Sequence, residues 1–99
     1  MNKRKIYISG PITGVPDFKE RFAEVEEMYR QKGFYVISPA KLNEILPEEG
    51  TTWEEYMDFA LMLMRKCDTI HLLPGWKNSK GATVEYYVAL ERDMIILEG

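Results

Sequence analysis

This chain of 99 residues has little cysteine, no long apolar run and no excess of positive charge. Cys67 is the only cysteine, which excludes an internal disulfide and a cysteine metal cluster and fits a reducing, cytoplasmic location. No apolar stretch approaches the length of a transmembrane helix, so we expect no membrane partner. The net charge of −3 offers no broad basic surface for a nucleic-acid polymer.

Histidine is equally scarce, because His71 is the only one in the chain. It stands on an apolar run, and no second ligand follows at a metal-ligating spacing. We therefore interpret His71 as a core residue, and we expect neither a bound metal nor another cofactor.

What the chain does have is an alternation of short, β-branched runs with segments of helical periodicity. This order predicts a single α/β domain over residues 1–99, a three-layer, doubly wound parallel sheet of about four strands with helices on both faces (Rossmann- or flavodoxin-like). Both faces of the first run are apolar, as in a central parallel strand. The expected strands are Lys5–Ser9, Phe34–Ser38, Thr69–Leu73 and Met94–Leu97.

Capping signals predict where the helices begin. Asp17 and Glu20 form a D-x-x-E signal before the first helix, which Gly33 ends. Thr52 and Glu55 form a second capping box, and a third helix is expected over Ser79–Arg92. Residues 39–51, between the second strand and the second helix, are expected to form a loop.

The second helix, expected over residues 53–67, is apolar on nearly all sides. One stripe runs from Trp53 to Cys67, while Phe59, Met62 and Leu63 make the opposite side apolar as well. Such a helix in a small domain indicates burial against another subunit in a homo-oligomer. The alternative is a central helix covered by the chain's own loop.

In parallel sheets of this kind, ligands bind beyond the carboxyl ends of the strands. The loops of interest are therefore Ser9–Val15, Pro39–Thr52 and Pro74–Lys80. In the first loop, Ser9, Gly10 and Thr13 could hold a phosphate or a sugar, although a Gly-Pro turn without function would look similar. The loop matches neither G-x-G-x-x-G nor a P-loop.

The segment from Leu72 to Ala89 is the most informative part of the chain. Gly75 and Gly81 permit tight turns and close approach to a ligand, and Ser79 stands at a helix start that can bind an anion. Glu85 shares a helix face with two alanines, so its carboxylate points inward or into a cleft. The helix dipole favours its ionised form, which could attack an anomeric carbon. The alternative is a solvated helix acid.

Four further residues are candidates. Tyr7 lies near the ligand end of its strand, and its hydroxyl needs a partner such as a carboxylate if it is buried. Asp68 opens the third strand and either supports the site or ends the preceding helix. Trp53 and Trp76 could stack on a base, although Trp53 also begins the apolar stripe.

Two motifs carry a family resemblance: Y-I-S-G-P-I-T-G over residues 7–14, and C-D-x-I-x-L-L-P-G-W-x-x-S-x-G-A-x-x-E over residues 67–85. With them the chain resembles the nucleoside 2-deoxyribosyltransferase-like superfamily, and within it a small branch described as a domain of unknown function. The resemblance covers nearly the whole chain.

The resemblance implies cleavage of the N-glycosidic bond of a 2′-deoxynucleoside or its 5′-monophosphate. It makes Glu85 the nucleophile, Tyr7 the residue that orients it, and Ser79 a ligand of the 5′-phosphate. It places Ser9, Gly10 and Thr13 in the site, and it implies a homo-oligomer whose active sites a neighbouring subunit completes.

The chain departs from the family pattern at Ala60, where relatives carry an aspartate that assists the departing base. Asp58 lies about 200° away around the helix and cannot replace it without a shift. Thr13 stands where nucleotide-hydrolysing relatives favour arginine. The expected function is hydrolysis or transfer at the N-glycosidic bond through a deoxyribosyl-enzyme intermediate. The alternatives are a nucleotide-binding or sensing module with little turnover, and a structural oligomer with a vestigial cleft.

Overall fold

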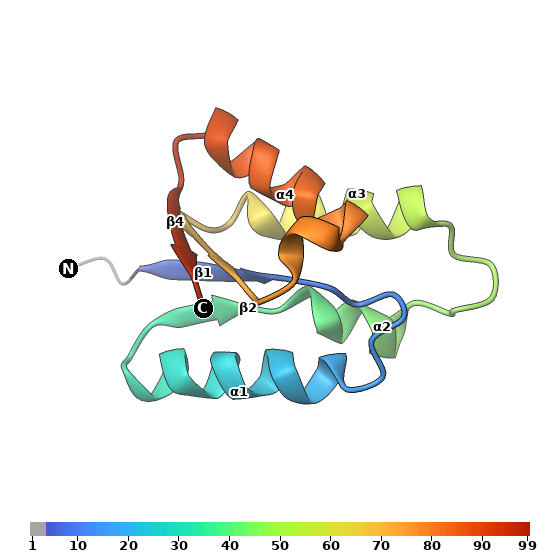
Figure 1. Cartoon of the computed structure of the whole chain (residues 1–99), viewed down its shortest axis with the longest axis horizontal. Coiled ribbons are helices and arrows are strands. Elements are labelled where there is room, and N and C mark those ends of the chain that lie inside the picture. The colour runs from blue at the N-terminus through green and yellow to red at the C-terminus, as the bar shows by residue number, and fades with distance from the viewer. Residues whose placement is uncertain (1–3) are drawn as a thin grey trace.

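Four parallel strands form one sheet in the computed structural model, which describes residues 4–99 (Figure 1). The first three residues of the predicted domain lie outside the described part. The strands are β1 (Lys5–Ser9), β2 (Tyr35–Ile37), β3 (Thr69–Leu72) and β4 (Ile95–Glu98), in the spatial order β2-β1-β3-β4. The doubly wound α/β fold predicted from the sequence is therefore confirmed.

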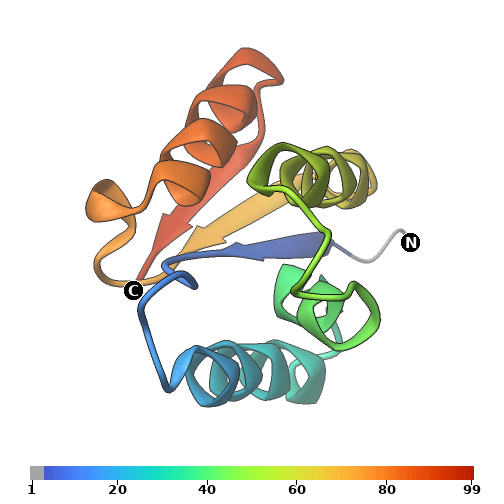
Figure 2. The ribbon, with the colours of Figure 1, turned by 90° about the vertical axis from the view of Figure 1, so that its right-hand side faces the viewer.

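Helices cover both faces of this sheet (Figure 2). The helices are α1 (Phe18–Gln31), α2 (Leu42–Ile45), α3 (Trp53–Met64) and α4 (Lys80–Glu91), with single 3-10 turns η1 (Pro39–Lys41) and η2 (Trp76–Asn78). In Figure 2, α1 lies on one side of the sheet, and α3 and α4 lie on the other. No helix within residues 4–99 combines the length and apolar character needed to cross a membrane.

Alternation along β1 divides the core into two halves. Ile6 and Ile8 pack with Phe22 and Tyr29 of α1. Tyr7, between them, points to the other face and packs in the cluster formed with α3 and α4. Because side chains alternate along a strand, Ser9 shares the face of Tyr7. Two hydroxyls of β1 are thus directed toward the same helical layer.

The capping box predicted at Thr52 is confirmed, and Ser79 also caps its helix. Thr52 and Glu55 form the expected capping box, with donor–acceptor distances of 2.8 and 3.0 Å, and the Ser79 hydroxyl accepts from the Ala82 N–H at 3.2 Å. The signal at Asp17 predicts the helix start correctly, because α1 begins at Phe18, but Asp17 makes no side-chain cap. Its backbone lacks the extended conformation of a capping residue, and its carboxylate pairs with Arg21 at 3.0 Å instead.

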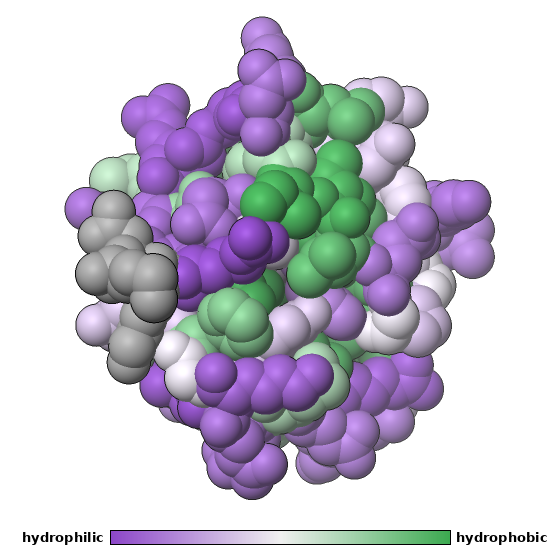
Figure 3. All heavy atoms as spheres, turned by 90° about the vertical axis from the view of Figure 1, so that its left-hand side faces the viewer, coloured by the Kyte–Doolittle hydropathy of each residue, from purple (hydrophilic) through white to green (hydrophobic). Residues whose placement is uncertain are grey.

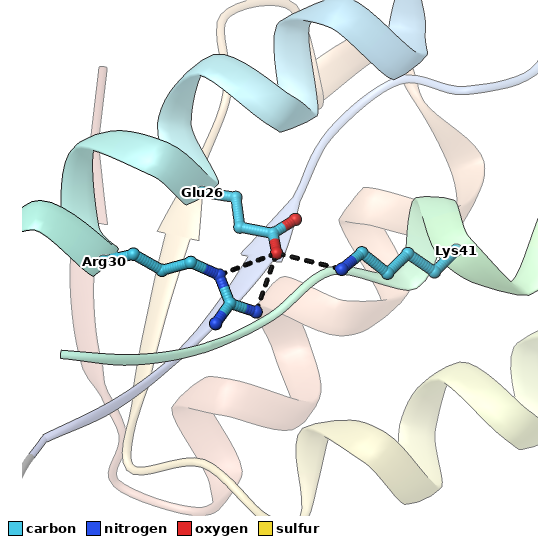
Figure 4. Close-up of polar contacts among 3 residues, drawn as sticks. All are labelled: Glu26, Arg30 and Lys41. Atoms are coloured by element: carbon cyan, nitrogen blue, oxygen red, sulfur yellow. Dashed lines mark hydrogen bonds and ion pairs between the residues drawn. The ribbon is translucent and has the colours of Figure 1, made fainter.

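Residues 39–51, predicted as a loop, contain η1 and the single turn of α2. Ala40 and Leu42 are buried there, and four residues are too few to show a helical period in the sequence. Glu26 of α1 accepts from Arg30 at 2.8 Å and from Lys41 at 3.1 Å, which ties η1 to α1 (Figure 4). Since partly exposed ion pairs contribute at most about 1 kcal/mol, burial holds this segment more than charge does.

The apolar helix ends earlier than predicted, at Met64, and residues 65–67 continue as a turn. Met57, Ala60 and Met64 are buried on its inner side. Phe59 and Met62, on its outer side, are 48% and 64% exposed. The chain's own loops therefore do not cover the outer face of α3.

Candidate active site

Glu85 lies in the second turn of α4 with its side chain directed toward the sheet. Ala82 and Ala89 lie on the same face of the helix and are buried with it. Because both alanines are small, the helix can approach the sheet closely enough to bury the carboxylate, which is only 5% exposed. The solvated-acid interpretation of Glu85 does not hold in this structure.

Two hydroxyls of β1 hold the buried carboxylate. The Tyr7 hydroxyl donates to Oε2 of Glu85, and the Ser9 hydroxyl donates to Oε1 at 2.7 Å. Both donors are fully buried. Each carboxylate oxygen therefore has one donor, and the position of the carboxylate is fixed from two directions. This is the core of the candidate site.

Burial dominates the ionisation of this carboxylate. Loss of hydration raises the pKa of Glu85 from 4.5 to about 7, and the hydrogen bonds from Tyr7 and Ser9 partly oppose that rise. The expectation that the helix dipole keeps Glu85 fully ionised is therefore wrong, since desolvation outweighs it. Burial, followed by the charge of Glu85, raises the pKa of Tyr7 well above its usual range. Tyr7 thus stays protonated and remains a donor.

A pocket of about 680 Å³ opens in front of Glu85. Its walls come from the loop after β1, from residues 39–57, and from the start of α4. Among the predicted site residues, those that line it are Gly10, Thr13, Ser79, Gly81 and Glu85. Tyr7 and Ser9 lie behind Glu85 and support it. The pocket therefore lies at the predicted carboxyl edge of the sheet, with Glu85 as its buried acid.

The glycines of the site act through space and backbone conformation. A Cβ on Gly10 would lie 2.8 Å from Cβ of Leu73, so the first loop can pass β3 only without a side chain. Gly75 has a φ of +88° and starts η2 beside Pro11, and it shapes the turn without lining the pocket. Gly81 lines the pocket, where a Cβ would lie 3.3 Å from the Met57 sulfur.

The structure does not bring Asp68 to the site. Its carboxylate accepts from the Lys5 N–H at 3.3 Å and from the Thr69 hydroxyl at 2.7 Å. These residues begin their strands, so Asp68 lies at the amino edge of the parallel sheet, whereas the pocket lies at the carboxyl edge. The predicted supporting role of Asp68 is therefore wrong for this pocket.

Ala60 and His71 are both enclosed by the core. Ala60 has no exposed surface and contributes no polar group. His71 is bonded through Nδ1 to the Tyr29 hydroxyl at 2.5 Å and through Nε2 to the Gly99 carbonyl at 2.7 Å. His71 is thus a satisfied core residue, as predicted. Residues 4–99 contain no group of three acidic, histidine or cysteine side chains placed to hold a metal.

Several pocket residues were missed by the sequence patterns. Tyr56, assigned to the apolar stripe, lines the pocket and donates to the Pro39 carbonyl at 3.0 Å. Burial and the charge of Glu85 raise its pKa. Asn43 and Glu48 also line the pocket, from a segment that carries no local motif. Trp53, unlike these residues, is a candidate from the sequence; it lines the pocket, with the Lys80 ammonium 4.1 Å from its ring centroid.

Comparison with known proteins assigns the chain to a family. Residues 4–98 match the family described as Domain of unknown function (DUF4406). A solved structure described as a 2-desoxiribosyltransferase from Leishmania mexicana is similar, with a TM-score of 0.73 and 19% sequence identity. The match covers 96% of this chain and 63% of that one, so the chain spans less than two thirds of its structural relative. The search of curated proteins found no match.

The family match covers nearly the whole chain, and at 19% identity the structural match speaks for the fold alone. Together they agree with the motifs at residues 7–14 and 67–85. The chain belongs to the DUF4406 family, a branch of unknown function with the nucleoside 2-deoxyribosyltransferase-like fold.

Proposed function

We propose that this protein cleaves the N-glycosidic bond of a 2′-deoxynucleoside or its 5′-monophosphate, with Glu85 as the nucleophile. The observation that carries the proposal is the Glu85 carboxylate, which is buried, held by two hydroxyl donors and open to a pocket. A carboxylate in this setting can attack C1′ and form a deoxyribosyl ester while the base departs.

The two hydroxyl donors orient the carboxylate of Glu85. Tyr7 and Ser9 keep the carboxylate from rotating, so an attacking lone pair can stay aimed at the pocket. When the ester later breaks, the same hydroxyls stabilise the carboxylate that returns. Water as the acceptor gives hydrolysis, and a second base gives transfer. Both outcomes share the first half of the reaction.

The start of α4 suits the sugar or its phosphate. Ser79 caps this 12-residue helix and lines the pocket together with Gly81, so the helix start can offer backbone N–H groups to an anion in the pocket. Thr13 and Gly10 line the wall formed by the first loop. Lys19 contributes a positive charge to the same pocket.

The test is release of free base from a panel of 2′-deoxynucleosides and their 5′-monophosphates, followed by chromatography. Wild type should release base, and Glu85→Gln should reduce release below detection while keeping the size of the side chain. Glu91→Gln, an exposed acid at the end of the same helix, is the matched control and should behave as wild type. Absence of base release by folded wild type from every substrate refutes the proposal.

The second candidate is a nucleotide-binding or sensing module with little turnover. Ala60, in place of the family's leaving-group aspartate, favours it, because general-acid assistance is worth roughly 10²–10⁴ in rate. Calorimetric titration with the same panel separates the two candidates. Saturable binding that Ser79→Ala weakens, without base release, supports the module.

The outer face of α3 supports the proposal of a homo-oligomer, as do further apolar side chains on α4 and β4. The exposed residues are Phe59, Met62, Tyr87, Leu90, Ile95 and Leu97. Figure 3 displays apolar surface gathered on the side of the molecule where β4 runs. Sedimentation should give a dimer or higher state that Met62→Glu dissociates. Met28→Glu, on α1 across the sheet, is the control and should leave that state unchanged.

The proposed location remains the cytoplasm, on the ground of the single buried thiol of Cys67. Cell fractionation with an antibody against the protein tests it.

A further inference from the structure

The chemistry proposed for Glu85 leaves one need unmet, a group that protonates the departing base. Residue 60, where the family resemblance led us to expect an aspartate, is an alanine with no exposed surface. The other acids at the start of α3 do not line the pocket. Of these, Glu55 is held in the capping box with Thr52, whose hydrogen bonds lower its pKa. An acid for the leaving group must therefore come from a different element.

The pocket contains a second carboxyl group besides that of Glu85. Within residues 4–99, the acidic side chains that line it are Glu85 and Glu48. Glu48 belongs to the segment between α2 and α3, where Pro47, Thr51 and Thr52 also line the pocket. Glu49, its neighbour, does not line the pocket. The segment thus forms a wall to which one of two adjacent glutamates contributes.

The two carboxyl groups come from different walls. Glu85 enters from α4 and lies over β1, whereas Glu48 comes from the connection between α2 and α3. Figure 2 shows this connection and the start of α4 on different sides of the carboxyl edge of the sheet. A substrate between these walls can place C1′ at Glu85 and its base toward Glu48. Two carboxyl groups flanking one scissile bond are the arrangement that glycoside cleavage uses.

The surroundings of Glu85 and Glu48 suit the two carboxyl groups to different roles. Glu85 is buried and held by two donors, which suits a nucleophile that must not be solvated. Glu48 is exposed, so water can reach its carboxyl group between turnovers. Asn43 also lines the pocket and offers an amide that can bind a base edge.

We propose that Glu48 is the leaving-group acid of this pocket, in the place of the aspartate that Ala60 removes; the proposal rests on the proposed function. In the first step a carboxylate oxygen of Glu85 forms a bond to C1′ while the C1′–N bond breaks. The electron pair of the broken bond stays on the nitrogen of the base and takes the proton of the Glu48 carboxyl. In the second step the Glu48 carboxylate takes a proton from water. The hydroxide oxygen bonds to C1′, and Glu85 is released as a carboxylate. The sum is one bond hydrolysed and both glutamates restored.

The experiment compares substrates whose bases differ in their need for a proton. One member is a 2′-deoxyguanosine 5′-monophosphate methylated at N7, whose base already carries the positive charge that protonation would supply. The others are unmethylated 2′-deoxynucleotides with bases of graded leaving ability. The variants are Glu48→Gln and, as the matched control, Glu49→Gln. Since both positions are exposed, both variants should fold like wild type.

In the first turnover, before the deoxyribosyl ester has to break, we expect Glu48→Gln to slow release of unmethylated bases by roughly 10²–10⁴-fold and to leave release from the methylated substrate within a few-fold of wild type. The loss should grow as the base becomes a poorer leaving group, and Glu49→Gln should change nothing. An equal loss on all substrates, or no loss on any, overturns the role of Glu48. If wild type cleaves no substrate, the proposed function fails first. If Glu85→Gln abolishes all release while Glu48→Gln is silent, only this inference fails.

Discussion

Replacing Glu85 with glutamine should change how the stability of the protein depends on pH, whether or not the protein is an enzyme. Glutamine keeps the length of the side chain and an oxygen that can accept from Tyr7 or Ser9. It removes the ionisable group whose folded pKa is raised by burial to about 7. The variant therefore isolates the free energy of burying that charge.

The sign and size follow from proton linkage. Between the unfolded pKa of 4.5 and the folded pKa of about 7, the folded state holds a proton on Glu85 that the unfolded state has lost. The stabilisation from this proton is complete below 4.5 and is lost as pH rises through 7. Because one pKa unit corresponds to about 1.4 kcal/mol, the full span is about 3 kcal/mol.

The assay is urea unfolding of wild type and Glu85→Gln at steps from about pH 4.5 to about pH 8, where both are folded. Other titrating groups are common to both proteins, so the difference between their unfolding free energies reports residue 85. We expect wild type to lose about 3 kcal/mol relative to the variant over this range. Glu91→Gln should follow wild type. Parallel curves for wild type and Glu85→Gln refute the claim that burial raises the pKa of Glu85.

Three smaller perturbations test other parts of the site. Tyr7→Phe removes one donor from Glu85, so the pKa of Glu85 should rise further and the pH-dependent loss of stability should move to higher pH in the same urea series. Gly10→Ala should destabilise the fold by about 1–3 kcal/mol, because the new Cβ lies 2.8 Å from Cβ of Leu73; an unchanged melting temperature contradicts this reasoning. Thr52→Ala should cost about 1 kcal/mol through loss of the capping box, measured by urea unfolding, with Thr52→Ser as the variant that retains it.

Much of the fold can be predicted from local signals in the sequence. The β-branched run of β1 and its alternation predict a central strand, and the capping box at Thr52 predicts the first residue of α3. At Asp17 the same reasoning predicts the start of α1 but not the cap, because the carboxylate pairs with Arg21 instead. The reasoning failed for the short turn of α2, because a single turn has no period to detect. Local signals thus predict where a long element begins more reliably than which partner a side chain takes.

The site could be predicted only in part. Ser79 and Glu85 lie within one motif, so their helix and their relative positions follow from spacing. Asp68 could have been excluded from the sequence, because a residue that opens a parallel strand lies at the amino edge of the sheet, where the register places it beside Lys5. The loop of Glu48 was expected at the ligand edge, but Glu48 itself could not be selected, because this segment has no motif and only its packing decides which side chains reach the pocket.

The sequence by itself determined that Tyr7 and Ser9 share one face of a strand and that Glu85 shares one face of a helix with two alanines. These relations depend on fixed backbone periods of two and 3.6 residues. Tyr7 and Ser9 are 78 and 76 positions away from Glu85 in the sequence. Only the tertiary structure decided that the two faces meet, so that both hydroxyls donate to the Glu85 carboxylate. The same closure removes water from Glu85 and raises its pKa, since desolvation depends on everything that packs around a group and not on its neighbours in sequence.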